Sequence, residues 1–426
     1  MTQQFRRQSH NTGIPASEGL KAGRIGRHLR PISMLLITVA GLALSASALA
    51  QAPVPKAGAH GVAVTDQQMA DYRRKLAEFE AAQQNFNEQA NPYWTLIADK
   101  RKSRNAKRSA GQPIVPDDYV LTQPPQYTGP GKPVAPSLPA IAVPPRTIPV
   151  VADFLLNAQQ QFQFVPTRPA TEIDFKKAYV RMASAAGLTK EQAVRIYAFE
   201  SGGNGKYDVQ AGLEFDRPGA KAISTALGYN QLLTTNSVEL LAEQGDQFLK
   251  TLRNRAAQMT GPQKAALERK ITILQTMIDF TRTVADEWSL HEQLGTTPKG
   301  LGIHALNLDV DVGPLLQTQK LMNSVIFAKR KGHSAPLTAA ELEMMNLTGD
   351  GNGFDMVSMP QDLRPKVPTS NFFSRGGYER NSIARKHNVV SALLSGTDAK
   401  MDQEVLLRGA KDMAAAFGSR EESVSK

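Results

Sequence analysis

From about Ala170 onward, the sequence follows the spacing of α-helices and shows almost none of the alternation typical of β-strands. Helix starts are marked by capping boxes, in which Ser, Thr or Asn is followed three residues later by Glu or Gln. They are Thr189 with Gln192, Asn236 with Glu239, and Thr338 with Glu341. The pattern predicts a mainly α-helical domain over residues 169–396, with one long helix at 262–294, and a C-terminal tail over residues 397–426.

Residues 51–168 differ from this domain in composition. A basic cluster at 99–108 is explained most simply as a solvated face, and the prolines that follow favour extended chain. We expect a basic, Pro-rich and largely disordered tether through which other cell-envelope proteins could bind. It contains one amphipathic helix within residues 65–91, which needs a partner because its apolar stripe is narrow. That stripe consists of Met69, Tyr72, Leu76, Phe79 and Ala82.

The first 50 residues predict a secretory signal peptide. A basic leader precedes an apolar run of about sixteen residues, which is too short to span a bilayer comfortably. The run ends in Ala48-Leu49-Ala50, the small-residue pattern of a cleavage site. We expect cleavage near Ala50, a periplasmic or secreted protein, and no stable membrane span afterwards. Retention of the segment as a membrane anchor is the alternative.

The composition argues against several kinds of site and partner. The chain has no cysteine, and its seven histidines do not cluster at metal-binding spacing. His291, beside Trp288, is expected to be structural. The net charge of +11 belongs partly to the leader, and export without a recognition motif argues against nucleic acid. We expect no metal and no cofactor.

Residues 348–355 place Asp350, Asn352 and Gly353 at the offsets of a calcium loop. The twelfth position of such a loop would be Met359, where a bidentate glutamate is required. A Gly-rich turn is the favoured interpretation, and cation binding at this stretch stays open.

The stretch "AVRIYAFESGG" places Glu200 four residues after Ile196 and three after Tyr197, on the apolar stripe of a helix. Burial there, together with the unpaired carbonyls at a helix C-terminus, raises the pKa of a carboxyl group. A raised pKa suits a general acid that works near neutral pH. The alternative is that Glu200 points to water where the helix ends at Gly202 and Gly203.

Glu200 and Ser201 are followed by "AISTALGYNQLLTTNS" at 222–237, and this ordered pair of motifs resembles the lytic transglycosylases and goose-type lysozymes. The resemblance covers about sixty residues and implies a lysozyme-like fold that cuts the glycan strands of peptidoglycan. It assigns Glu200 as the catalytic acid and Ser201 as the residue that orients the acid or the substrate. It places Gly228 and Gln231 in the turn that lines the substrate cleft.

Two departures from the family pattern concern the sugar-binding residues. Tyr229, which we also expect near the substrate, stands where the family usually has an aliphatic residue. The third family motif, which contacts the sugar, has no clear counterpart. Tyr378 and Asn381 in "GGYERNS" are the better candidates for it, and the weaker pair is His304 and Asn307.

The reaction outcome depends on whether a second carboxylate faces Glu200. An inverting hydrolase needs one across the scissile bond, and Asp208, Glu214 or Asp216 in the insert between the two motifs could supply it. A transglycosylase uses one acid, and the resemblance implies that it forms 1,6-anhydro-N-acetylmuramic acid. We favour this single-acid cleavage of the β-1,4 bond between N-acetylmuramic acid and N-acetylglucosamine. A lysozyme-type hydrolase, a non-catalytic envelope protein that binds glycan or a partner, and a helical structural protein are the alternatives.

Overall fold

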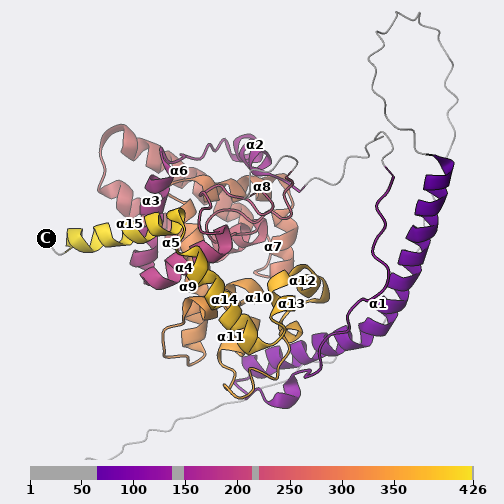
Figure 1. The fold of residues 1–426 in the computed structure, drawn as a ribbon. Coiled ribbons are helices and arrows are strands. Elements are labelled where there is room, and N and C mark those ends of the chain that lie inside the picture. Colours follow the sequence, from indigo (N-terminus) through magenta and orange to yellow (C-terminus); the bar gives the residue numbers. More distant parts are fainter. Residues whose placement is uncertain (1–64, 137–147, 214–219, 425–426) are drawn as a thin grey trace, which may run out of the picture. The chain divides into compact units, whose positions relative to one another are not determined.

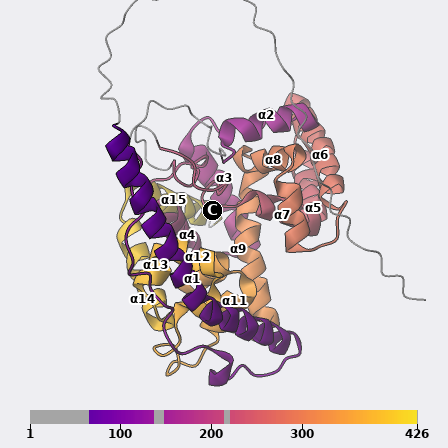
Figure 2. The same cartoon turned by 90° about the vertical axis from the view of Figure 1, so that its right-hand side faces the viewer.

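The computed structural model describes residues 65–136, 148–213 and 220–424. The predicted signal peptide, Glu214 and Asp216 lie outside these ranges. Within them the chain is helical without a β-strand, so the mainly α fold class is confirmed (Figure 1 and Figure 2). None of the helices in these ranges combines the length and apolar character needed to cross a membrane. The helices are α1 (Asp66–Ser109), α2 (Val151–Phe162), α3 (Glu172–Ala186), α4 (Lys190–Ser201), α5 (Thr234–Ala257), α6 (Gly261–Thr281), α7 (Trp288–Gly295), α8 (Pro298–His304), α9 (Gly313–Arg330), α10 (Ala339–Thr348), α11 (Asp350–Val357), α12 (Arg375–Arg380), α13 (Ser382–Lys386), α14 (Val390–Glu404) and α15 (Arg408–Val424), with short 3₁₀ helices at Pro116–Asp118, Ala305–Leu308 and Thr369–Phe372.

Two of the three predicted capping boxes are confirmed. Thr189 accepts a bond from the Gln192 amide, and the Gln192 side chain accepts one from the Thr189 amide, both at 3.1 Å. Thr338 and Glu341 do the same at the start of α10. The third box is wrong because α5 begins at Thr234 and therefore contains Asn236. The Asn236 side chain instead accepts a bond from the Leu233 amide at 3.1 Å.

The single helix predicted at 262–294 is also wrong. α6 ends at Thr281, and the hydroxyls of Thr281 and Thr283 bond to carbonyls three residues earlier, at 2.8 and 2.7 Å. Such side-chain bonds satisfy carbonyl groups that the end of a helix leaves free. A new helix, α7, begins at Trp288.

The main hydrophobic core extends beyond residues 169–396 at both ends. At the N-terminal side, Phe154 and Ala158 of α2 are fully buried, and the Phe154 ring meets His304 edge-on at 4.7 Å. At the C-terminal side, Met401 of α14 and Met413 of α15 are fully buried in the same core. The expected boundaries near 168 and 396 therefore need correction, because amphipathic helices on both sides complete the core.

α1 is longer than predicted and includes the basic cluster. The chain that follows α1 returns alongside it, where Tyr127 packs edge-on against Phe79 and Phe86 at 6.2 and 5.4 Å (Figure 1). The hydroxyl of Tyr93 donates to the Thr122 carbonyl at 3.0 Å. Part of the predicted Pro-rich tether is thus ordered against α1, and one residue of the apolar stripe, Phe79, packs against it.

Candidate active site

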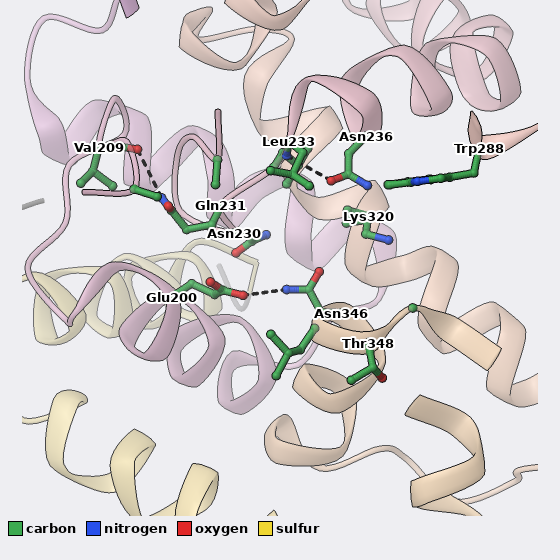
Figure 3. A pocket seen from close by; sticks show the side chains of 15 residues that line it. Glu200, Val209, Asn230, Gln231, Leu233, Asn236, Trp288, Lys320, Asn346 and Thr348 are labelled. Atoms are coloured by element: carbon green, nitrogen blue, oxygen red, sulfur yellow. Dashed lines mark hydrogen bonds between the residues drawn. The ribbon is translucent and has the colours of Figure 1, made fainter. Parts of the chain in front are cut away.

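Glu200, at the end of α4, lies in the wall of a cavity of about 660 Å³ (Figure 3). The other walls come from the turn before α5, the start of α7, the middle of α9 and the end of α10. Figure 3 shows side chains from these elements converging on the space above Glu200. Those labelled are Val209, Asn230, Gln231, Leu233, Asn236, Trp288, Lys320, Asn346 and Thr348.

A second carboxyl group, that of Glu343 on α10, lies directly behind Glu200. Glu200 is partly buried, whereas Glu343 has no exposed surface. The two carboxyls are within hydrogen-bonding reach of each other. Asn346 donates to Glu200 at 2.9 Å, and the same nitrogen is 3.5 Å from Glu343. Because two adjacent carboxyls in a buried site cannot both ionise readily, the pair shares one proton at neutral pH.

Burial raises the pKa of Glu200 to about 6, as expected from its position on the apolar stripe. Three groups oppose this rise: the carboxyl of Glu343, the ammonium of Lys400, and the amide of Asn346. Burial and the neighbouring Glu200 charge raise the pKa of Glu343 well above the usual range. Glu200 is therefore the carboxyl of the pair that ionises first, and it takes up its proton near pH 6.

Glu343 and Asn346 are not among the site residues predicted from the sequence. Within "AAELEMMN" they follow Ala339 by four and seven residues, so all three share one helix face. Ala339 is fully buried. An acid on a buried face was the signal used for Glu200, and it applies equally to Glu343.

The turn that the family resemblance emphasised does reach the Glu200 cavity. Gln231 lines it, and its side-chain amide donates to the carbonyls of Gly228 and Val209 at 2.8 and 3.2 Å. Gly228 has a φ of +82°, and a Cβ there would lie 2.5 Å from the amide nitrogen of Gln317. Only glycine satisfies both conditions, so Gly228 shapes the turn that presents Gln231.

Ser201 and Tyr229 do not line the Glu200 cavity. The buried Ser201 hydroxyl donates to the Tyr197 carbonyl at 2.6 Å. Tyr229 is fully buried, with its hydroxyl bonded to Glu172 and its ring edge-on to Tyr197 at 4.8 Å. An aromatic cluster beneath the turn explains a tyrosine at a position where the family has an aliphatic residue.

The candidates for the third motif lie elsewhere. Tyr378 lines a separate cavity of about 690 Å³ together with Trp94, and Asn381 caps α13 by accepting from the Ala384 amide at 2.8 Å. In the alternative pair, His304 is fully buried and bonded to Ser237 and to the Thr225 carbonyl, each at 2.8 Å. Burial lowers the pKa of His304 to about 4, so its ring is neutral. Asn307 belongs to the same buried network, through its bond to Ser237 at 2.9 Å.

The loop carboxylate expected as a possible base lies outside the Glu200 cavity. Asp208 forms an ion pair with Arg168 at 2.5 Å. Among the described residues that line this cavity, Glu200 carries the only carboxyl group. Glu343 has no exposed surface and cannot reach a substrate.

The calcium-like stretch forms helix ends instead of a Gly-rich turn. α10 ends at Thr348 and α11 begins at Asp350. Asp350 accepts a bond from Ser324 at 2.6 Å, whereas Asp355 pairs with Arg104 and Arg108 at 3.2 and 2.6 Å. His, Asp and Glu residues in the described ranges form no group of three that could hold a metal.

No family model, curated protein or solved structure matches this chain. The geometry of the site limits the chemistry that is open to it. A carboxyl that takes up a proton near pH 6 can protonate the leaving oxygen of a substrate. The amide side chains of the cavity can bond to hydroxyl and acetamido groups, and Trp288, whose side chain is 46% exposed, can stack on a sugar ring.

Proposed function

We propose that this protein is a lytic transglycosylase that cuts the β-1,4 bond between N-acetylmuramic acid and N-acetylglucosamine, with Glu200 as its single acid and base. The observation that carries the proposal is the pair of carboxyls formed by Glu200, at the end of α4, and Glu343 of α10. One faces a cavity lined by amides and an exposed indole, and the other is buried behind it. Cleavage would take place in the periplasm or outside the cell, after export.

In the reaction that the family resemblance implies, Glu200 first donates its proton to the glycosidic oxygen. The bond from C1 to that oxygen breaks, and the acetamido oxygen of the muramic acid bonds to C1. The Glu200 carboxylate then removes the proton of the 6-hydroxyl, whose oxygen displaces the acetamido oxygen at C1. The product is a 1,6-anhydro ring, and Glu200 has regained its proton.

The position of Glu343 favours this outcome over hydrolysis. Glycosidases that use two carboxyls hold them about 5–5.5 Å apart when retaining and about 6.5–9.5 Å apart when inverting. Two carboxyls within hydrogen-bonding reach of each other are closer than either arrangement allows. Because Glu343 is also shielded from the cavity, it is a positioning residue for Glu200.

Digestion of purified sacculi by residues 51–426 tests the proposal. We expect anhydro-muropeptides from the natural chain and none from Glu200→Gln. Asp208→Asn, which removes a carboxyl outside the cavity, is the matched control and should cleave normally. Reducing ends in place of anhydro ends would support a lysozyme-type hydrolase. Binding to sacculi without cleavage would support a non-catalytic envelope protein.

A further inference from the structure

A second cavity, of about 640 Å³, adjoins the one that contains Glu200. Trp288, Lys320 and Gly349 line both cavities, which therefore form two lobes of one groove. Figure 3 shows Trp288 and Lys320 at the end of the first lobe opposite Val209 and Gln231. A ligand longer than the first lobe would pass these two side chains.

Trp288 is placed to act as a stacking surface. It is the first residue of α7, and 46% of its surface is exposed although it lines both lobes. Ligand pockets are lined largely by apolar and aromatic side chains, and an indole that keeps this much exposed surface inside a groove is open to contact by a ligand. Its flat apolar face and single N–H donor suit the CH face and hydroxyl edge of a pyranose.

The second lobe has polar walls, with amides, three carboxylates and two cations among its lining residues. α9 contributes Gln319 and Asn323, and α5 contributes Glu239 and Gln247. Amides and carboxylates at adjacent positions can bond to neighbouring sugar hydroxyls, as donors and acceptors respectively. Phe327 adds apolar surface on the same side.

We propose that the groove binds one continuous β-1,4 glycan, which runs from Glu200 across Trp288 into the second lobe. This inference rests on the proposed function for its ligand, because a glycan-cleaving site needs room for sugars beyond the scissile bond. Contacts made by distant sugars would be used to orient the chain at Glu200, so short substrates should react more slowly as well as bind more weakly.

The test uses the two tryptophans of the chain, Trp94 and Trp288. In the full chain carrying Glu200→Gln and Trp94→Phe, Trp288 is the one fluorescent indole, and no substrate is consumed. Chito-oligosaccharides of two, four and six units are titrated into it. We expect affinity to rise at least tenfold from dimer to hexamer, with the Trp288 emission changing only for the longer chains.

Calorimetry with the same sugars compares the binding affinities of the variants. Trp288→Ala should abolish the tenfold higher affinity for the hexamer and leave the affinity for the dimer unchanged. Asn323 lines the second lobe alone, and Asn323→Ala should abolish part of the higher affinity for the hexamer. Trp94→Phe is the matched control and should bind as the Glu200→Gln parent does. Circular dichroism of each variant verifies that it is folded.

Equal affinity for all chain lengths, or no binding of the hexamer, would overturn the inference. The Trp288 emission could instead change with a disaccharide that carries its peptide stem and not with the hexamer. That result would assign the second lobe to the stem peptide and would also overturn the inference. Length-dependent binding by a protein that leaves sacculi uncut would retain the inference and reject the transglycosylase.

Discussion

The carboxyls of Glu200 and Glu343 differ in exposure and in pKa: the first lines the cavity, and the second is buried and affects the pKa of the first. Glu200 reaches the cavity and takes up its proton near pH 6, while burial and the neighbouring Glu200 charge hold the pKa of Glu343 well above its usual range. By donating a hydrogen bond to the Glu200 carboxylate, Glu343 keeps the pKa of Glu200 from rising further. The pKa of Glu200 is thus set in part by a carboxyl that has no exposed surface.

Glu200→Gln should stabilise the fold at pH 7.5 and leave it unchanged near pH 4. The pKa of Glu200 is raised from 4.5 to about 6, so its ionisation costs more in the folded state than in the unfolded chain. The stability that the protonated carboxyl confers is fully present below pH 4.5 and is lost as the pH rises through 6. Above that window the variant should gain up to about 2 kcal/mol in free energy of unfolding. Urea unfolding at the two pH values measures this difference in free energy of unfolding. A variant that is destabilised equally at both pH values would contradict the prediction.

Glu343→Ala should move the alkaline limb of the activity profile to higher pH, because it removes a donor that favours the ionised form of Glu200. Glu343→Gln keeps an N–H donor in the same place and should leave that limb nearly unchanged. Profiles of kcat/KM on sacculi, together with NMR titration of the Glu200 carboxyl carbon, give the measurement. Identical profiles for the two variants would show that Glu343 serves packing alone.

At the scale of elements, the sequence predicts the helix starts that are determined by hydrogen bonds between residues close in the chain. α4 and α10 begin where Thr189 and Thr338 bond to amides three residues on. The start of α5 was missed because the chain enters it from the turn closed by the bridge between Leu227 and Leu232, which leaves no local signal for Leu233 as the cap. The Glu200 cavity could be predicted only in part for the same reason, since Glu343 meets Glu200 through the packing of α10 on α4.

Gly228→Ala should destabilise the protein more than a glycine substitution at an equally strained but open turn. Alanine at a φ of +82° would be strained, and its Cβ would also displace the Gln317 amide, which bonds to the Leu227 carbonyl at 3.1 Å. Gly332, with a φ of +88° and open space around it, is the matched control. We expect a loss of about 1 kcal/mol at Gly332 and of 2–3 kcal/mol, roughly, at Gly228. Thermal unfolding of both variants measures this, and equal losses would rule out the steric contribution of Gln317.

At the scale of the whole described chain, the basic cluster attaches α1 to the helices that follow. Arg104 is fully buried, and it donates to Asp355 and to the carbonyls of Asp118 and Asn371 at 3.2, 2.9 and 2.7 Å. Composition alone favoured a solvated basic face, because a pattern of charges does not reveal a partner 251 residues away. Part of the cluster is therefore structural.

Arg104→Ala should cost about 3–5 kcal/mol, because it leaves buried carbonyls and part of the Asp355 charge without a partner. Lys102→Ala, at an exposed position two residues away, should stay within about 0.5 kcal/mol of the natural chain. Urea unfolding compares the two, and limited proteolysis should show faster cleavage around residues 110–136 in the Arg104 variant alone. Equal stability of the two variants would refute the structural role of the buried guanidinium.

The start of α15 closes over the end of the helix that carries Glu200: the Ala410 amide donates to the Gly203 carbonyl at 2.9 Å, and Lys400 of α14 contributes charge to the carboxyl pair. A chain cut before residue 400 consequently keeps Glu200, Glu343 and Asn346 but lacks the Lys400 ammonium, one of the three groups that oppose the rise in the Glu200 pKa. It also lacks the amide that bonds to the Gly203 carbonyl beyond the end of α4. We expect the pKa of Glu200 in such a fragment to lie above its value in the whole protein.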